Sequence, residues 1–144
     1  MPTEPAEETA LEVRRVMPGP PAEVFRALTD PELMSRWMSP VGAAEAEVDL
    51  REGGRFRLVM RGEDREIEHT GEYRTVRPPS LLVFTWRSPF TGGMESVVTI
   101  RLAERGPDTQ LVLIHEQLPP GAAESHTGGW GRMLDRLRSE LVAS

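Results

Sequence analysis

The sequence predicts an α+β fold in which an antiparallel sheet packs against one long C-terminal helix. The last quarter of the chain carries apolar residues at the spacing of one helical face. Most of the preceding chain alternates between polar and apolar residues, as strands with one buried face do. The turns between these segments are too short for parallel crossover connections, so the sheet must be antiparallel.

A strand and two short helices are predicted first. Residues 11–17 suit a strand, which the proline-rich run after them stops. A helix then begins at Pro20 or Pro21, because proline fits the first helical turn. Asp30 is a good N-cap and Pro31 a good first-turn residue, so a second short helix follows at once.

Six further strands form a meander. Gly53 and Gly54 supply the backbone freedom that a hairpin turn needs. On the first hairpin the outward-facing residues are acidic or arginine, which predicts cross-strand ion pairs on the outer face of the sheet. The predicted strands are, in order, 44–50, 55–61, 66–76, 81–86, 94–102 and 109–117.

The final helix has one buried stripe and one solvated face. The stripe consists of Trp130, Met133, Leu134, Leu137 and Leu141, and the solvated face of Arg132, Asp135, Arg136, Arg138 and Glu140. Gly128 and Gly129 each cost a helix about 1 kcal/mol relative to alanine. We expect either a close approach of this helix to a strand or ligand, or an irregular first turn. His126 is either a residue at a cavity entrance or a solvent-exposed helix residue.

Length and composition set limits on the function. The 144 residues suit one domain, and we assign residues 10–144 to it and residues 1–9 to a flexible acidic tail. The net charge of −6 argues against a nucleic-acid partner. No apolar run approaches the length of a membrane span, and the acidic start does not fit a signal peptide, so we expect no membrane association and a cytoplasmic protein.

Several kinds of chemistry find no support in the sequence. There is no cysteine, which excludes a thiolate nucleophile or thiolate metal site. All 17 basic residues are arginine, so lysine Schiff-base and P-loop chemistry are excluded as well. The three histidines lack metal-ligand spacing, and no serine has a nucleophile-elbow setting. We therefore predict no metal, no cofactor and no catalytic residue.

The order of elements and a set of short motifs resemble a known family. The motifs are Pro21-Ala-Glu-Val-Phe25, Thr29-Asp-Pro31, Arg36-Trp37, Gly53-Gly-Arg-Phe56, Gly71-Glu-Tyr73, Pro78-Pro79, Leu82-Val-Phe-Thr-Trp86, His115-Glu116 and His126-Thr-Gly-Gly-Trp130. Together they resemble the activator of heat shock protein 90 ATPase homologue family of the START-like (SRPBCC, Bet v 1-like) superfamily, over about residues 11–142.

The resemblance implies a helix-grip fold. In such a fold a curved seven-stranded antiparallel sheet wraps around the C-terminal helix, two short helices after the first strand close one end, and a cavity lies between. Single-domain bacterial members are mostly of unknown function. Relatives in the superfamily bind lipids, hormones or polyketides, and some cyclise or hydrolyse them.

The candidate ligand-binding residues combine polar groups with an aromatic and thioether cage. Three side chains that point inward, His69, Tyr73 and His115, have the chemistry to anchor a ligand carbonyl or hydroxyl. The other interpretation is that each is a buried polar group paired within the protein. The apolar candidates are Trp37, Met60, Phe84, Trp86, Met94, Trp130, Met133 and Leu134.

The leading hypothesis is a protein that binds a small, mainly apolar molecule beneath its C-terminal helix. A second hypothesis is a cyclase or hydrolase that uses a histidine of the same cavity as its base. A third is a co-chaperone-like module that binds another protein through the outer face of the sheet. Open sheet edges allow either a monomer or a homodimer.

Overall fold

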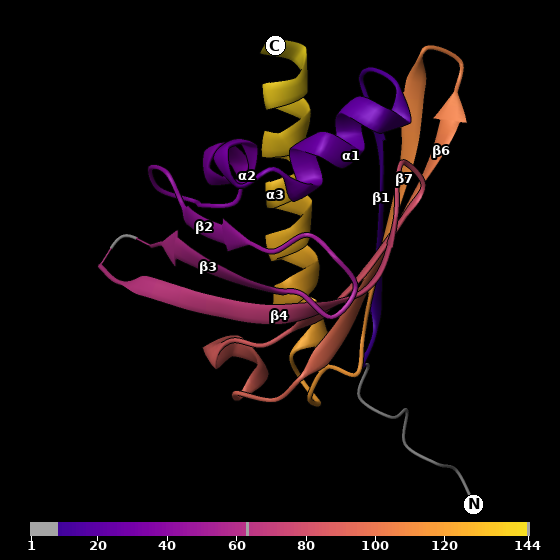
Figure 1. Ribbon diagram of the computed structural model, residues 1–144. Helices are drawn as coiled ribbons and strands as arrows, with labels where there is room; N and C mark the ends of the chain where they lie inside the picture. The colour runs from indigo at the N-terminus through magenta and orange to yellow at the C-terminus, as the bar shows by residue number, and fades with distance from the viewer. Residues whose placement is uncertain (1–8, 63, 144) are drawn as a thin grey trace, which may run out of the picture.

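The computed structural model describes residues 9–62 and 64–143 of the chain. The first strand and two helices are β1 (Leu11–Met17), α1 (Pro21–Thr29) and α2 (Pro31–Trp37). The strands that follow are β2 (Glu45–Val48), β3 (Arg55–Arg61), β4 (Glu66–Arg77), β5 (Leu81–Trp86), β6 (Ser96–Arg105) and β7 (Asp108–Glu116). A short 3-10 helix, η1 (Pro89–Thr91), follows β5, and α3 (Ala123–Ala143) ends the chain (Figure 1).

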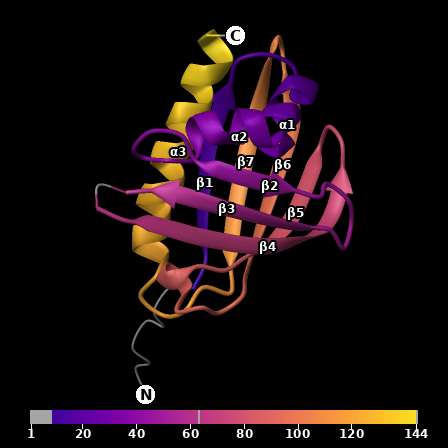
Figure 2. The same ribbon diagram turned by 60° about the vertical axis from the view of Figure 1, so that its left-hand side comes forward.

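The strands form one antiparallel sheet that curves around α3. Its order is β1-β7-β6-β5-β4-β3-β2, so β1 pairs with β7 and the remaining neighbours follow the chain. Figure 2 shows that β2, β3 and β4 cross in front of β1, β7 and β6 at a steep angle. Strongly twisted sheets curl in this way. The helix-grip arrangement predicted from the sequence is therefore confirmed.

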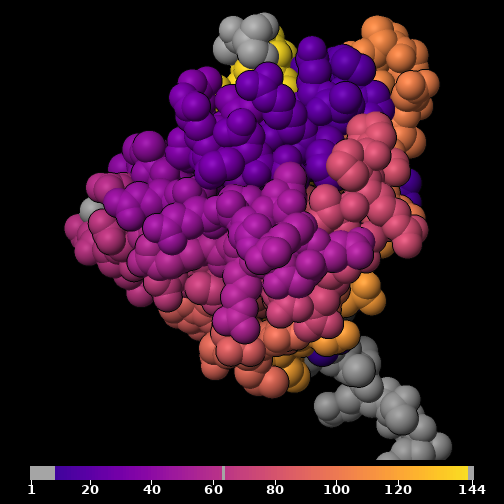
Figure 3. Space-filling model, in the orientation of Figure 1, coloured from indigo at the N-terminus to yellow at the C-terminus, as the bar shows by residue number. Residues whose placement is uncertain are grey.

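Helices α1 and α2 close one end of the sheet. Asp30 ends α1 and caps α2, because its carboxylate accepts hydrogen bonds from the backbone N–H groups of Glu32 and Leu33. In the space-filling view these helices lie above β2 and β3, and the C-terminal turns of α3 emerge behind them (Figure 3). The opposite end of α3 lies beyond β4, near the chain that joins β5 to β6 (Figure 1).

One hydrophobic core joins the sheet to all three α-helices. Strand residues that alternate inward, such as Leu58, Ile100 and Leu113, meet Leu134 and Leu137 of α3. On the outer face of the sheet, Arg61 of β3 pairs with Glu45 of β2 at 3.4 Å, as predicted for the hairpin, and Arg57 Nε of β3 lies 2.6 Å from Glu68 Oε2 of β4. These side chains are half exposed, so solvent screens both pairs and each stabilises the sheet only slightly. Burial of the apolar face stabilises the sheet far more.

The structure corrects several predicted boundaries. Strand β2 ends at Val48, and Leu50, predicted on its inner face, is 40% exposed. Helix α3 begins at Ala123, so Gly128 and Gly129 lie inside regular helix and the irregular first turn is not found. The predicted flexible tail falls mostly on residues 1–8, which lie outside the described residues. Its last residue, Thr9, accepts a hydrogen bond from the Leu118 N–H at 2.9 Å.

None of the helices in the described part of the chain combines the length and hydrophobicity that a membrane span requires.

Two glycines with opposite surroundings provide a test of the packing. A Cβ at Gly71 of β4 would collide with the Thr85 carbonyl oxygen and the Phe56 ring, whereas a Cβ at Gly129 of α3 would meet nothing within 4 Å. We expect Gly71→Ala to lower the free energy of unfolding by about 3 kcal/mol through overpacking. Gly129→Ala should raise it by about 0.5–1 kcal/mol through helix propensity. Urea unfolding measures both, and equal effects would contradict this packing.

Candidate functional site

A cavity of about 320 Å³ lies between the N-terminal half of α3 and strands β3, β4 and β5. Its size is at the lower end of the range for small-molecule sites, roughly 300–1,000 Å³. The wall is formed by Pro40, Met60, Gly62, Ile67, His69, Trp86, Phe90, Ser125, His126, Gly129, Trp130, Arg132, Met133 and Arg136. Most of these side chains are apolar, as in sites for apolar ligands.

Five of the predicted ligand-binding residues meet in this wall. They are Met60 of β3, His69 of β4, Trp86 of β5, and Trp130 and Met133 of α3. Each is less than 9% exposed. The alternation of the strands directs the first three inward, and the helical stripe directs the other two toward them. Residues far apart in the sequence thus form one aromatic and thioether surface.

His69 is the buried polar group that this wall offers to a ligand. Its Nδ1 lies 3.2 Å from the Ile67 carbonyl oxygen, which accepts a hydrogen bond from the Nδ1–H. Burial lowers the pKa of His69 to about 4, so the ring is neutral at pH 7. A neutral ring that donates from Nδ1 has a lone pair on Nε2. Within the described chain this nitrogen has no partner, so it is free to accept a hydrogen bond from a ligand.

Trp86 lies at the centre of the aromatic wall. Its ring centroid is 4.7 Å from that of His69 and 5.0 Å from that of Trp130. The indole Nε1 is buried and has no hydrogen-bond partner among the described residues. An unpaired buried donor costs roughly 1–3 kcal/mol, and such groups are rare in folded proteins. The structure therefore keeps this side chain in place at a cost in stability.

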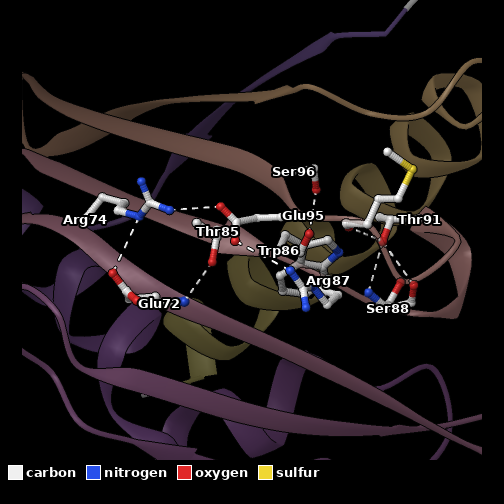
Figure 4. Close-up of polar contacts among 10 residues, drawn as sticks. Glu72, Arg74, Thr85, Trp86, Arg87, Ser88, Thr91, Glu95 and Ser96 are labelled. Atoms are coloured by element: carbon white, nitrogen blue, oxygen red, sulfur yellow. Dashed lines mark hydrogen bonds and ion pairs between the residues drawn. The ribbon is translucent and has the colours of Figure 1, made fainter.

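His115 is a paired core histidine. Its Nδ1 accepts a hydrogen bond from the Trp130 Nε1–H at 3.0 Å, so the neutral ring carries its proton on Nε2. The Nε2–H donates to the Ser96 hydroxyl at 2.7 Å. That hydroxyl in turn donates to the Trp86 carbonyl at 2.6 Å (Figure 4). Burial lowers the pKa of His115 to about 3. Both nitrogens are used within the protein, as the alternative interpretation expected, and His115 is not among the residues that line the cavity.

The other predicted residues also lie outside the cavity wall. Trp37 is buried between helices, with its Nε1–H bonded to the Ala27 carbonyl at 3.0 Å. Tyr73 and Phe84 pack in the core with ring centroids 6.2 Å apart, and burial raises the pKa of Tyr73. Leu134 is a fully buried core residue. Their shared apolar character predicted burial correctly but did not distinguish core from cavity wall.

Met94 is the clearest correction. It was predicted at the start of strand 94–102 and as a ligand contact, but β6 begins only at Ser96 and Met94 is 60% exposed. The preceding residues form η1, which was not predicted from the sequence, followed by a turn through Gly92 and Gly93. Ser88 and Thr91 form a capping box around this short helix. The Thr91 hydroxyl also donates a hydrogen bond to the Met94 carbonyl at 2.7 Å. Phe90 of η1 joins the cavity wall instead.

Sequence reasoning missed one face of α3. Residues 129, 132, 133 and 136 have the spacing of a single helical face, and all four line the cavity. The arginines among them, Arg132 and Arg136, were assigned to the solvated face. Gly129 leaves open space on the α3 side of the cavity, because it has no side chain there and does not approach a strand closely. His126 also lines the wall and is half buried.

No group of three or more His, Asp or Glu side chains in the described residues is arranged to hold a metal ion.

The model of the family described as activator of Hsp90 ATPase homolog 1-like protein matches residues 18–142. This match covers most of the chain. The chain belongs to this family.

Solved structures agree with that assignment. A protein from Rhodobacter sphaeroides is 27% identical, with a TM-score of 0.83, covering 98% of this chain and 97% of its own. An HSP90 activator from Plasmodium falciparum is 26% identical, with a TM-score of 0.78 and coverages of 93% and 96%. CalU16 from Micromonospora echinospora is 28% identical, with a TM-score of 0.73 and coverages of 94% and 82%.

This chain therefore has the START-like, Bet v 1-like fold that was predicted from its sequence. No curated protein matches the chain in sequence.

The two buried histidines predict a loss of stability in mild acid. Their folded-state pKa values, about 4 and about 3, lie below the ordinary value of 6.5, so the unfolded chain binds more protons as the pH falls below about 6.5. Each histidine should remove about 2 kcal/mol from the free energy of unfolding between pH 7.5 and pH 5. Urea unfolding at both pH values measures the sum.

A variant separates the contributions. His69→Gln should remove about half of this pH dependence. Equal stability of the unaltered protein at pH 7.5 and pH 5 would contradict the buried neutral state of both histidines.

Proposed function

We propose that this protein binds a small, mainly apolar molecule in the cavity beneath α3. The observation that supports it most is a mostly apolar cavity next to a buried neutral histidine whose Nε2 has no partner among the described residues. A ligand hydroxyl or N–H group satisfies this acceptor. A purely structural core would fill such a space with side chains, because interiors pack densely.

The ligand-binding residues of this proposal are those that the cavity brings together. Met60, Trp86, Trp130 and Met133 supply apolar contact, and His69 orients the ligand. Thioether and aromatic side chains adapt to differently shaped apolar groups. Gly129 leaves the room that the ligand occupies. We place this function in the cytoplasm, in keeping with the absence of cysteine.

Simple binding fits the site better than catalysis. A general base works best when its pKa lies near the working pH. His69, with a pKa of about 4, is a weak base at neutral pH, and His115 is fully engaged with Trp130 and Ser96. A cyclase or hydrolase that uses these histidines would need their environment to change.

A co-chaperone role is the second candidate, favoured by the family and by the Plasmodium HSP90 activator of similar length. It would use the outer face of the sheet, where Arg74 joins Glu72 and Glu95 (Figure 4). These charges are paired with one another and half exposed, so they offer less to a partner than unpaired charges do.

Fluorescence of N-phenyl-1-naphthylamine tests cavity binding. This neutral, apolar compound has one N–H donor for His69, and its emission rises in apolar surroundings. We expect saturable binding, weakened at least about tenfold by Gly129→Phe, which fills the cavity. The control Val142→Phe adds the same ring at an exposed position of the same helix.

Circular dichroism and thermal unfolding establish that both variants are folded. Absence of saturable binding, or equal binding by the two variants, would contradict a ligand site under α3.

A further inference from the structure

We infer that the ligand of this cavity is an apolar acid, whose carboxylate lies against the guanidinium groups of Arg132 and Arg136 where the cavity opens to solvent. This inference rests on the cavity-binding function proposed above, and it names the chemical class of the ligand. It depends on three features of the described residues: the placement of two cations, the lack of acidic groups in the wall, and the neutral interior.

The two arginines lie one helical turn apart on the cavity face of α3. Arg132 is exposed and Arg136 is half buried, so they mark the boundary between cavity and solvent. The Arg136 Nε–H donates to the Trp37 carbonyl oxygen at 3.0 Å, which fixes this guanidinium and leaves its terminal nitrogens available. Like charges at this spacing destabilise a helix. Burial, and then the charge of Arg132, lower the pKa of Arg136.

No described carboxylate compensates these charges. The chain has 23 acidic and 17 basic residues, yet no aspartate or glutamate lies among the described residues that line the cavity. Eight of the 17 arginines form ion pairs in the described residues, as Arg15 does with Asp135 of α3 at 2.9 Å. Neither Arg132 nor Arg136 forms an ion pair in the described residues. Among the described residues, the cavity wall therefore carries two cations and no carboxylate.

The interior of the cavity determines where the acid group must lie. Trp86, Trp130 and Met60 surround the deep part, and His69 is neutral there. Burying an unpaired carboxylate among such groups is unfavourable. A ligand with one charged end therefore places its apolar body against the aromatic wall and its carboxylate against the arginines. Guanidinium groups match a carboxylate with parallel hydrogen bonds, which favours this head group over a neutral one.

A matched pair of compounds tests the inference. The probes are 6-hydroxy-2-naphthoate and 6-hydroxy-2-naphthamide, which share their ring system and hydroxyl and differ in charge. Their affinities are measured by displacement of N-phenyl-1-naphthylamine or by calorimetry. We expect the acid to bind at least about tenfold more tightly than the amide, and this preference to shrink as salt is added.

Two variants of equal charge locate the effect. Arg132→Gln should remove most of the preference for the acid, whereas Arg138→Gln, at an exposed position of α3 outside the cavity wall, should retain it. Equal binding of acid and amide, or an equal effect of the two variants, would overturn the inference while N-phenyl-1-naphthylamine binding still supported the cavity. If none of the three compounds bound, the proposed function and this inference would both fail.

Discussion

The hydrogen-bond chain through His115 is the constraint on which the rest of the structure depends. It runs from the Trp130 indole to His115, then to Ser96 and to the backbone of Trp86, and so ties α3 to β7, β6 and β5. These hydrogen bonds are buried, and each has a defined donor, because a neutral imidazole offers one donor and one acceptor. Buried polar networks that are fully paired favour one packing arrangement over its neighbours. The position of the helix over the sheet is set at this point, and with it the height of the cavity.

The cavity is formed by the residues next to the hydrogen bonds of His115. These hydrogen bonds hold the Trp130 indole and the Trp86 backbone in place. The neighbouring cavity-lining residues of α3 are Gly129 and Met133. The glycine leaves space that a larger side chain would occupy, and the unpaired donor of Trp86 adds a further cost in stability. A protein selected only for stability has no reason to retain both features. Together with a neutral His69 and two arginines that form no ion pair in the described residues, they are typical of a site arranged around a ligand.

The sequence predicted the architecture more fully than the site. Periodicity placed β1, β3 and β5 at the residues found, and Asp30 with Pro31 predicted the start of α2, because these signals are local. The choice between core and cavity wall is not local. Tyr73 and Phe84 alternate inward just as Trp86 does, yet only Trp86 reaches the wall, because sheet curvature decides which inward residue meets α3. Arg132 and Arg136 were missed because charge usually marks a solvated face, and Met94 was misplaced because the capped turn at η1 interrupts the strand pattern.

The most direct test of this account is nuclear magnetic resonance of the ¹⁵N-labelled histidine side chains during titration with 2-naphthol. This compound carries an apolar ring system and a single hydroxyl donor. The account predicts that the free protein shows His69 protonated on Nδ1 and His115 on Nε2. Saturable binding should then shift the Nε2 resonance of His69 and leave both nitrogens of His115 unchanged. Binding that saturates without moving the His69 resonance, or that moves those of His115, would contradict the account.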